Sequence, residues 1–410
     1  MSSQQIANRV IDVVSPAAMG AASKAMAELG MAGLIGAYCV QNDLVNAESI
    51  RALSKTSFSI LLPCFLGTGI INTIVSQQRQ QGGGGGIFTT DMLSPPLLAI
   101  LHAFLLFQCS YHILLPLLGI DKDTTRGRST AISCSFGNSG VIPLIFSEAL
   151  FRNRPNILAQ CYSGVSLYLV GWSPFFWSFG RSMLIGNENS FDSSKDDEAL
   201  SSPLSKVISQ TKQLASPPVK GVLTGMALAS IPAVGKLLVD GDSPLSIVFN
   251  SFQNLGRAAN PLGLLVLTSS LAMGFSTARS SKNSGGVAAA AACSPDKSAT
   301  TQKNVSPLQR WSCVSLARFI ISPPLMLGLL HLFQRIGFIA SSDQNPVIWF
   351  ILLLESCMPP AQNSVLMLQV AEKSEEASRM AQFLFGMYAT SMLPVIIIVG
   401  IILQSFHLTN

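Results

Sequence analysis

Two short polar interruptions inside apolar sequence carry the chemistry that this chain suggests. They read S-F-G-N-S-G-V-I-P-L at 135–144 and C-M-P-P-A-Q-N-S at 357–364, and each places an Asn beside Pro or Gly. A helix broken inside a bilayer leaves N–H and C=O groups unpaired, which is tolerated only where protein or a watered cavity covers them. The half-helix after each break offers free N–H groups and a partial positive charge, which suit a carboxylate. Matching breaks in two halves of a chain are expected at the substrate site of a transporter.

Polar side chains at the two breaks are the candidate substrate-binding residues. They are Asn138 and Ser139 in the first break, and Gln362 and Asn363 in the second. Asn and Gln side chains supply hydrogen-bond donors that an anion can use. The alternative is that the two Asn side chains only pair with backbone groups that the prolines set free. One side chain can fill both roles.

Two charged residues in apolar segments are candidates for charge or proton coupling. Glu355 lies about one helical turn before the second break, and an intramembrane carboxylate is a functional candidate by default. Its structural alternative is a partner for Arg257 or Arg318. Arg257 lies near the centre of a predicted span, where a cation costs about 2.5–3.5 kcal/mol and needs a partner or water. It could meet an anionic substrate, pair with Glu355 or Glu148, or lie nearer to the membrane interface than the predicted span places it.

Two histidines in one predicted span are further candidates for proton transfer. His102 and His112 are ten residues apart, so a regular helix places them nearly on one face and about 15 Å apart along its axis. They cannot share a metal ion at that separation, and hydrogen-bonded packing is the alternative to a proton relay. No metal site or cofactor is expected. Motifs of hydrolases, zinc proteases and phosphate-binding loops are missing, so the chain is not expected to be an enzyme.

Composition places the chain in the membrane. Of 410 residues, 49% are hydrophobic and 11% charged, against about a quarter charged in soluble domains. We predict an all-α polytopic membrane protein with ten transmembrane helices, in contact with the lipid bilayer. The predicted spans are 22–40, 57–75, 95–118, 130–150, 161–184, 219–239, 246–272, 312–333, 347–370 and 381–403.

The distribution of basic residues predicts the orientation. With ten spans and both termini on the non-cytosolic side, the cytosolic loops hold about 16 Lys and Arg and the opposite loops about 7. Residues 1–185 then form a first five-helix repeat, 186–217 a disordered central linker, and 218–410 a second five-helix repeat with a flexible loop at 279–307. Because five is odd, the repeats have opposite orientations, and the breaks fall in the fourth and ninth helices.

Three stretches resemble the auxin efflux carrier family, which includes the PIN and PIN-LIKES transporters. G-N-S-G-V-I-P-L (137–144) resembles its first crossover, and L-G-R-A-A-N-P-L-G-L-L-V-L (255–267) its L-G-x-A-x-x-P-x-x-L-L-x-L signature. P-P-A-Q-N-S-V-L-M-L-Q (359–369), followed by E-A-S-R (376–379), resembles its second crossover. The chain departs from the family at 268–269, where Thr-Ser replaces the usual Gly, and at Arg257, where the family often has a small or acidic residue.

The resemblance implies two inverted five-helix repeats, crossed fourth and ninth helices, and an elevator-like exchange. It further implies a homodimer and an organic-anion substrate, which is auxin in the plant members. Carried over to this sequence, it adds Pro143, Pro359 and Pro360 to Asn138 and Asn363 as residues that line the site. The short central linker is similar to that of members in the endoplasmic reticulum, and the plasma membrane is the alternative.

Two other functions fit the sequence less well. One is a sodium-coupled organic-anion transporter of the bile-acid type, which also uses broken helices. The other is a membrane receptor or scaffold that binds organic acids and moves none. A nucleic-acid partner is not expected. The sequence therefore favours efflux, or sequestration in an organelle, of a small organic anion such as an auxin-like carboxylate.

Overall fold

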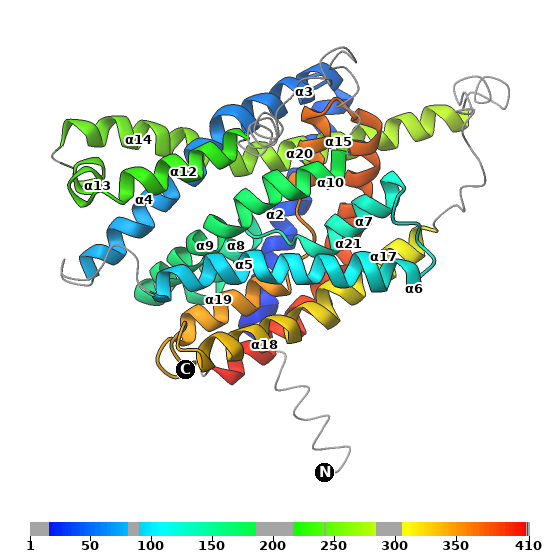
Figure 1. The fold of residues 1–410 in the computed structure, drawn as a ribbon. Coiled ribbons are helices and arrows are strands. Elements are labelled where there is room, and N and C mark those ends of the chain that lie inside the picture. The colour runs from blue at the N-terminus through cyan, green and yellow to red at the C-terminus, as the bar shows by residue number, and fades with distance from the viewer. Residues whose placement is uncertain are drawn as a thin grey trace, which may run out of the picture.

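The computed structural model describes residues 16–80, 90–185, 216–241, 243–283, 306–406 and 408. Within these residues the chain is helical, apart from turns, extended breaks and one isolated pair of bridged residues (Figure 1). Nearly all of the predicted linker 186–217, and most of the predicted loop 279–307, lie outside the described residues.

The first half of the chain contains nine helices in the described residues. They are α2 (Pro16–Gln41), α3 (Ala47–Thr56), α4 (Leu62–Gln80), α5 (Thr90–Cys109), α6 (Leu115–Leu117), α7 (Thr125–Ser135), α8 (Val141–Phe151), α9 (Pro155–Phe175) and α10 (Arg181–Ile185). Single π-helical turns at Ser57–Leu61, Ser110–Leu114 and Phe176–Gly180 join α3 to α4, α5 to α6 and α9 to α10.

The described part of the second half is also helical. Its helices are α12 (Pro217–Ala229), α13 (Pro232–Val239), α14 (Pro244–Arg257), α15 (Ala259–Asn283), α17 (Pro307–Ser315), α18 (Ser322–Arg335), α19 (Pro346–Ser356), α20 (Asn363–Val370) and α21 (Ser374–Ser405). A π-helical turn at Leu316–Ile321 joins α17 to α18. Pro opens several of these helices, where its missing N–H has no partner to lose.

Four helical segments in the described residues are long and apolar enough to cross a bilayer without a break. They are Ala47–Ser76, Met92–Leu117, Pro307–Arg335 and Ser374–Ser405. The pair α12 and α13, bent by 107°, makes a fifth if it counts as one span. The protein is therefore an all-helical, multi-pass membrane protein, as the sequence predicts.

Close packing of small residues joins α4 to α12. A Cβ added to Gly225 would lie 2.6 Å from the Gly67 carbonyl oxygen, and one added to Gly67 would lie 3.0 Å from that of Gly221. Small residues four apart let helices approach closely in lipid, where no hydrophobic effect drives helices together. These contacts, together with α14 against α4 and α15 against α2, form one group of helices. Helices α5, α9, α18 and α19 pack into another.

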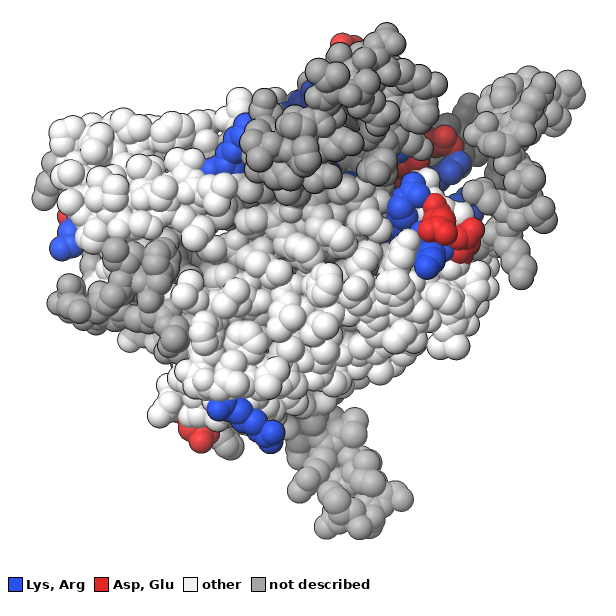
Figure 2. Space-filling model, viewed as in Figure 1, with Lys and Arg blue, Asp and Glu red and all other residues white. Residues whose placement is uncertain are grey.

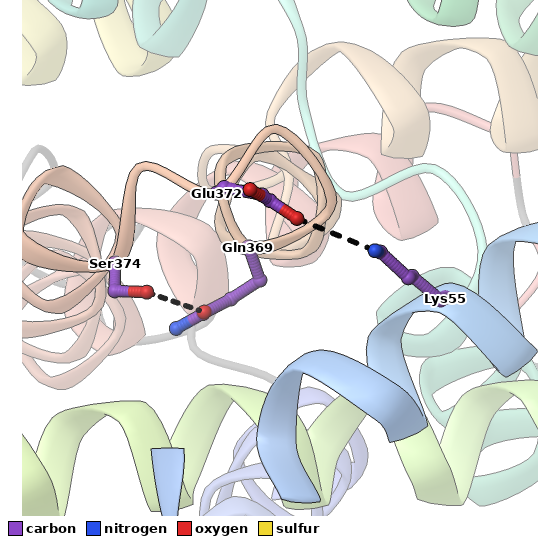
Figure 3. Close-up of polar contacts among 4 residues, drawn as sticks. All are labelled: Lys55, Gln369, Glu372 and Ser374. Atoms are coloured by element: carbon purple, nitrogen blue, oxygen red, sulfur yellow. Dashed lines mark hydrogen bonds and ion pairs between the residues drawn. The ribbon is translucent and has the colours of Figure 1, made fainter. Parts of the chain in front are cut away.

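Helix α21 runs from one end of the molecule to the other. Its 32 residues span about 48 Å. Near its start, Lys55 pairs with Glu372 at 3.4 Å (Figure 3), and Lys373 donates to the Ile185 carbonyl at 3.0 Å. Beyond its end, the Leu408 carbonyl accepts from Arg154 at 3.1 Å. The helix ends that the charge pattern assigns to one side, at 47–55, 185 and 371–374, thus lie together.

The surface agrees with a membrane-embedded body. On the face in Figure 2, charged side chains gather at the ends of the molecule, and a broad surface without charge lies between them. Two ion pairs between helices, Lys55 with Glu372 and Lys24 with Glu148, have partly exposed side chains.

Candidate substrate site

Two interruptions separate α7 from α8 and α19 from α20. After α7 the backbone becomes extended at Phe136, and α8 begins only at Val141. The second break runs from Cys357 to Gln362, and its prolines at 359 and 360 have no N–H to continue a helix. Both apolar helices therefore end inside the protein, and their free backbone groups need partners.

The two breaks cross and pair with each other. Gly137 and Pro360 form an antiparallel bridge. The Asn138 amide donates to the Pro359 carbonyl at 2.7 Å, and the Ala361 amide donates to the Phe136 carbonyl at 2.9 Å. Each unwound segment thus satisfies backbone groups of the other, which is the condition for such breaks to persist at membrane depth. We call residues 136–140 and 357–362 the crossing.

Tyr388 on α21 ties the crossing to a third helix. Its hydroxyl donates to the Pro360 carbonyl at 2.7 Å and accepts from the Asn138 side-chain amide at 3.1 Å. Tyr388 and Asn138 are both buried. The Asn138 side chain therefore reaches the backbone of the second break through the Tyr388 hydroxyl.

Arg318 holds the crossing from the other side. The residue is only 1% exposed, and its Nε donates to the Met358 carbonyl at 2.8 Å while Nη2 donates to the Glu355 carbonyl at 3.3 Å. The Glu355 carbonyl lies in the last turn of α19 and also accepts from the Met358 main-chain amide at 3.4 Å, whereas the Met358 carbonyl lies in the break. The guanidinium also lies against Gly137, because a Cβ there would fall 2.1 Å from Nη2. One cation thus contacts both breaks.

A small cavity of about 30 Å³ lies beside the crossing. Its polar lining comes from Asn138, Ser139, Ser173, Gln362 and Asn363. The starts of α8 and α20 both border it, so two sets of helix N-terminal amides point toward one place. The volume holds a water molecule and no organic acid, so this conformation is closed.

Apolar residues close the cavity on the side away from the crossing. They are Leu62, Phe65 and Leu66 from α4, Leu169 and Trp172 from α9, and Trp177 from the π-helical turn after α9. Flat aromatic and aliphatic walls with a few convergent polar groups are typical of sites for small organic molecules.

The structure brings four of the predicted binding residues together at this cavity. Asn138, Ser139, Gln362 and Asn363 line it. The three prolines assigned by resemblance, Pro143, Pro359 and Pro360, are buried nearby and are not part of its lining in this conformation. The prolines at 359 and 360 act through their carbonyls, which accept from Asn138 and Tyr388.

Glu355 and Arg257 lie apart. Glu355 is buried in the last turn of α19, next to Arg318. Arg257 is exposed at the end of α14, where its side chain donates to Asn254 at 3.3 Å. Glu148 pairs instead with Lys24 at 3.8 Å. Among the alternatives for Glu355, the structure supplies Arg318 as the neighbouring cation.

The histidines do not share a face, and the expectation that they do is wrong. His102 is buried, with Nε2 3.0 Å from the Ser322 hydroxyl. His112 is exposed and packs edge-on against Tyr111. His112 lies in the π-helical turn Ser110–Leu114, whose wider spacing rotates it away from the face of His102.

A larger groove lies elsewhere. It has a volume of about 500 Å³ and runs between α4, α12 and α14. Its lining is mostly apolar, and within the described residues Lys220 is its only charged side chain. The Thr68 hydroxyl in its wall already donates to the Cys64 carbonyl at 2.7 Å. Two helix starts and three side-chain amides converge at the cavity beside the crossing, whereas the groove is bordered by one helix start, that of α12 at Pro217, and by no Asn or Gln among the described residues.

Sequence reasoning missed the roles of Arg318 and Tyr388. The sequence indicates Arg318 only as a possible partner of Glu355 and indicates no role for Tyr388. A buried Arg in an apolar span must find acceptors, and that signal alone pointed to Arg318. A tyrosine in an apolar helix gives no comparable signal, because it packs well with or without a partner for its hydroxyl.

Replacing Tyr388 with Phe should lower the free energy of unfolding by about 1–3 kcal/mol, because the Pro360 carbonyl loses its buried donor. Denaturation of the purified protein in detergent measures this change. The matched control is Tyr162→Phe, since Tyr162 is 38% exposed and the substitution should change stability by less than about 0.5 kcal/mol. Equal stability of both variants would contradict the bridging role of Tyr388.

Comparison with known proteins decides the family. Residues 21–399 match the family described as membrane transport protein. The chain belongs to this family. The match covers both breaks and every residue that lines the cavity, and it confirms the resemblance to auxin efflux carriers. Members of the membrane transport protein family are transporters and not enzymes.

Curated relatives in the membrane transport protein family come from Arabidopsis thaliana. The chain is 20% identical to Protein PIN-LIKES 7 over 401 residues, which cover 87% of this chain and 90% of the relative. It is also 20% identical to Protein PIN-LIKES 5, over 60% of this chain and 65% of that relative. Protein PIN-LIKES 2 is 25% identical over 37% of this chain and 27% of its own length.

Proposed function

We propose that the protein is a secondary-type transporter that moves a small organic anion, an auxin-like carboxylate, by alternating access at the crossing. Membership of the membrane transport protein family supports transport as the activity. The observation that carries the proposal is the cavity bordered by the starts of both α8 and α20. Each helix start favours an anion by about 0.3–1 kcal/mol, and by up to about 2 kcal/mol where it is partly buried.

The charges around the cavity support an anionic substrate. Within the described residues, no Asp or Glu lines it, and the side-chain amides of Asn138, Gln362 and Asn363 supply donors. The Arg318 guanidinium lies behind Gly137, so a positive charge is buried next to the crossing. A carboxylate is compatible with these surroundings, whereas an organic cation would meet like charge there.

The architecture that we propose is ten transmembrane helices in two inverted five-helix repeats. Joining each broken or π-linked run into one span gives ten segments: α2, α3–α4, α5–α6, α7–α8, α9–α10, α12–α13, α14–α15, α17–α18, α19–α20 and α21. The breaks at the crossing then fall in the fourth segment of each half. Their antiparallel pairing is the arrangement that an inverted repeat predicts.

Opening the closed cavity requires movement between two sets of helices. The apolar wall opposite the crossing belongs partly to α4, which packs on α12 and α14. The crossing belongs to α7, α8, α19 and α20, which contact α5, α9, α17 and α21 and also meet the other group where α8 packs on α2 and α20 on α15. We infer an elevator-like exchange in which the helices of the crossing slide past the group that contains α4. We also propose a homodimer in which the group that contains α4 forms the contact between the two copies and stays fixed.

We propose the endoplasmic reticulum membrane, with the plasma membrane as alternative, and both termini on the non-cytosolic side. The helix ends at 47–55, 185 and 371–374 lie together, and they belong to the loops that are rich in Lys and Arg. The positive-inside rule assigns this end of the molecule to the cytosol.

Uptake of labelled indole-3-acetate and other organic acids into proteoliposomes tests the proposal. Asn138→Ala and Asn363→Ala should each lower the initial rate at least about tenfold, a loss equivalent to about 1.4 kcal/mol. Asn42→Ala is the matched control, because Asn42 is exposed and its side chain contacts only the neighbouring Tyr38 carbonyl among the described residues. Folding of each variant is checked by its elution profile in detergent.

Three results would speak against the proposal in different ways. Unchanged rates in both site variants would reject the crossing as the site. Uptake that disappears without Na⁺ would favour a sodium-coupled carrier of the bile-acid type. Saturable binding without any movement across the bilayer would favour a receptor or scaffold.

A further inference from the structure

Glu355 is a buried acid whose side chain has no evident structural use. It is 1% exposed, and neither carboxyl oxygen has a hydrogen-bond partner in the described part of the chain. The nearby Ser139 hydroxyl donates instead to the Gly137 carbonyl at 3.3 Å. Buried polar groups are nearly always paired, and an unpaired one calls for an explanation.

Arg318 is close to Glu355 and does not form an ion pair with it. The guanidinium donates to the main-chain carbonyls of Met358 and Glu355. No ion pair between the two side chains occurs within 4.0 Å in the described residues, although their charges interact. The hydrogen bonds of Arg318 thus go to main-chain carbonyls and not to the Glu355 carboxyl. That carboxyl can therefore gain or lose a proton without breaking an ion pair.

Other titratable groups around this pair are few in the described structure. Tyr168 on α9 and Cys357 face both Glu355 and Arg318, while Cys134 on α7 faces Arg318. Tyr and Cys side chains ordinarily ionise at about pH 8.5 or above. His102 on α5 contacts the Ser322 hydroxyl at the start of α18, and its charge also interacts with that of Arg318. In this set, Glu355 and His102 are the groups whose side chains ordinarily ionise below about pH 7.

The charge behind the crossing depends on Glu355. With the carboxyl protonated, Arg318 leaves a net charge of +1. With the carboxyl ionised, the net charge is zero. Ser139 connects this pair to the cavity, because it interacts with Glu355 and also lines the cavity beside Asn138. An anion in the cavity therefore meets one more positive charge when Glu355 holds its proton.

We propose that Glu355 is a proton-binding residue that couples proton uptake to binding of the anionic substrate. This inference rests on the proposed function of the crossing as an anion site. Anion binding favours the protonated carboxyl, so up to one proton from solvent joins a Glu355 oxygen with each anion bound and returns to solvent when the anion leaves. Because coupling is reciprocal, a proton on Glu355 tightens anion binding by the same factor by which the anion favours the proton.

The sign of the pH dependence follows directly. A carboxylic acid substrate stays ionised above about pH 6, so its own charge is constant in that range. As the pH rises and Glu355 loses its proton, the net positive charge behind the crossing disappears. The dissociation constant of the anion should therefore rise with pH, by about 5–150-fold in total.

Equilibrium binding of labelled indole-3-acetate to the purified full-length protein from about pH 6 to about pH 8 tests the coupling. The wild type should bind more weakly as the pH rises. Glu355→Gln mimics the protonated acid, and should bind tightly with a dissociation constant that does not change with pH. His102→Gln is the control, and should keep the pH dependence of the wild type.

Proton uptake by the wild type gives a second readout that does not need a variant. In weakly buffered solution with a pH-sensitive dye, binding of saturating indole-3-acetate should take up about 0.4–0.85 proton per anion at the pH where the dissociation constant changes most, which is the range that 5–150-fold coupling gives. This measurement keeps the proposal testable if Glu355→Gln does not fold.

The contrary outcomes separate this inference from the proposed function. Binding by the wild type that is independent of pH and takes up no proton would overturn the role of Glu355 while the anion site stands. A pH dependence that persists in Glu355→Gln and disappears in His102→Gln would also overturn it. Absence of any saturable binding at every pH would instead overturn the proposed function, and the coupling with it.

Discussion

Replacing Arg318 with Met should lower the free energy of unfolding by about 2–4 kcal/mol and abolish anion uptake. The guanidinium donates to the buried Met358 carbonyl and to the Glu355 carbonyl, which also accepts from the Met358 main-chain amide at 3.4 Å. Each buried acceptor that loses its donor costs about 1–3 kcal/mol. The same change removes the buried cation next to the crossing. Denaturation in detergent and uptake into proteoliposomes measure the two effects.

The matched control is Arg335→Met in the same helical run. Arg335 is exposed in the last residue of α18, so the charge change is identical and no buried acceptor is lost. We expect a change in unfolding free energy of less than about 0.5 kcal/mol and uptake near the wild-type rate. If Arg318→Met is as stable as Arg335→Met, Arg318 does not hold the crossing.

Replacing Gly137 with Ala should destabilise the protein by about 3 kcal/mol or more and reduce uptake to background. The new methyl carbon would lie 2.1 Å from Arg318 Nη2, 2.9 Å from Cζ and 3.3 Å from the Met358 carbonyl oxygen. Overpacking a buried site ordinarily costs about 1–3 kcal/mol. Here it also displaces the guanidinium from its carbonyls, which adds the cost of those hydrogen bonds.

Gly140→Ala is the control for this substitution, from the same break. A Cβ added to Gly140 meets no atom within 4 Å in the described part of the chain. Stability should therefore stay within about 0.5 kcal/mol of the wild type. A stable Gly137→Ala variant that transports normally would show that the guanidinium does not need the space beside the first break.

The breaks were predictable because their cause is local. Pro359 and Pro360 lack N–H groups, and Gly137 and Gly140 are poor residues for a helix interior, so the sequence itself states where the helices end. The repeated placement of these features in two halves also predicted that the breaks would meet. The bridge between Gly137 and Pro360 follows from the same reasoning, since two unwound segments in lipid need each other.

The residues that hold the breaks were not predictable in the same way. Arg318 and Tyr388 lie 40 residues before Met358 and 28 residues after Pro360, and only the fold brings them to those carbonyls. Their contacts depend on the rotation of α21 and of the run from α17 to α18. A single sequence does not fix that rotation.

Helix irregularities account for the remaining differences. A regular helix already places His112 about 80° around its axis from His102, so the expected shared face overlooked this offset. The π-helical turn Ser110–Leu114 changes the phase further. Several predicted spans consist of two shorter helices, such as α12 and α13 with a 107° bend. Hydropathy detects apolar length, and it does not report whether the backbone is continuous.

A cryo-EM map of the protein with bound indole-3-acetate tests the central claim most directly. We expect density for a carboxylate between the starts of α8 and α20, within hydrogen-bond reach of Asn138, Ser139 or Asn363. The cavity around it should be larger than the present volume of about 30 Å³. Density for the ligand in the groove between α4, α12 and α14, with the crossing still closed, would contradict it.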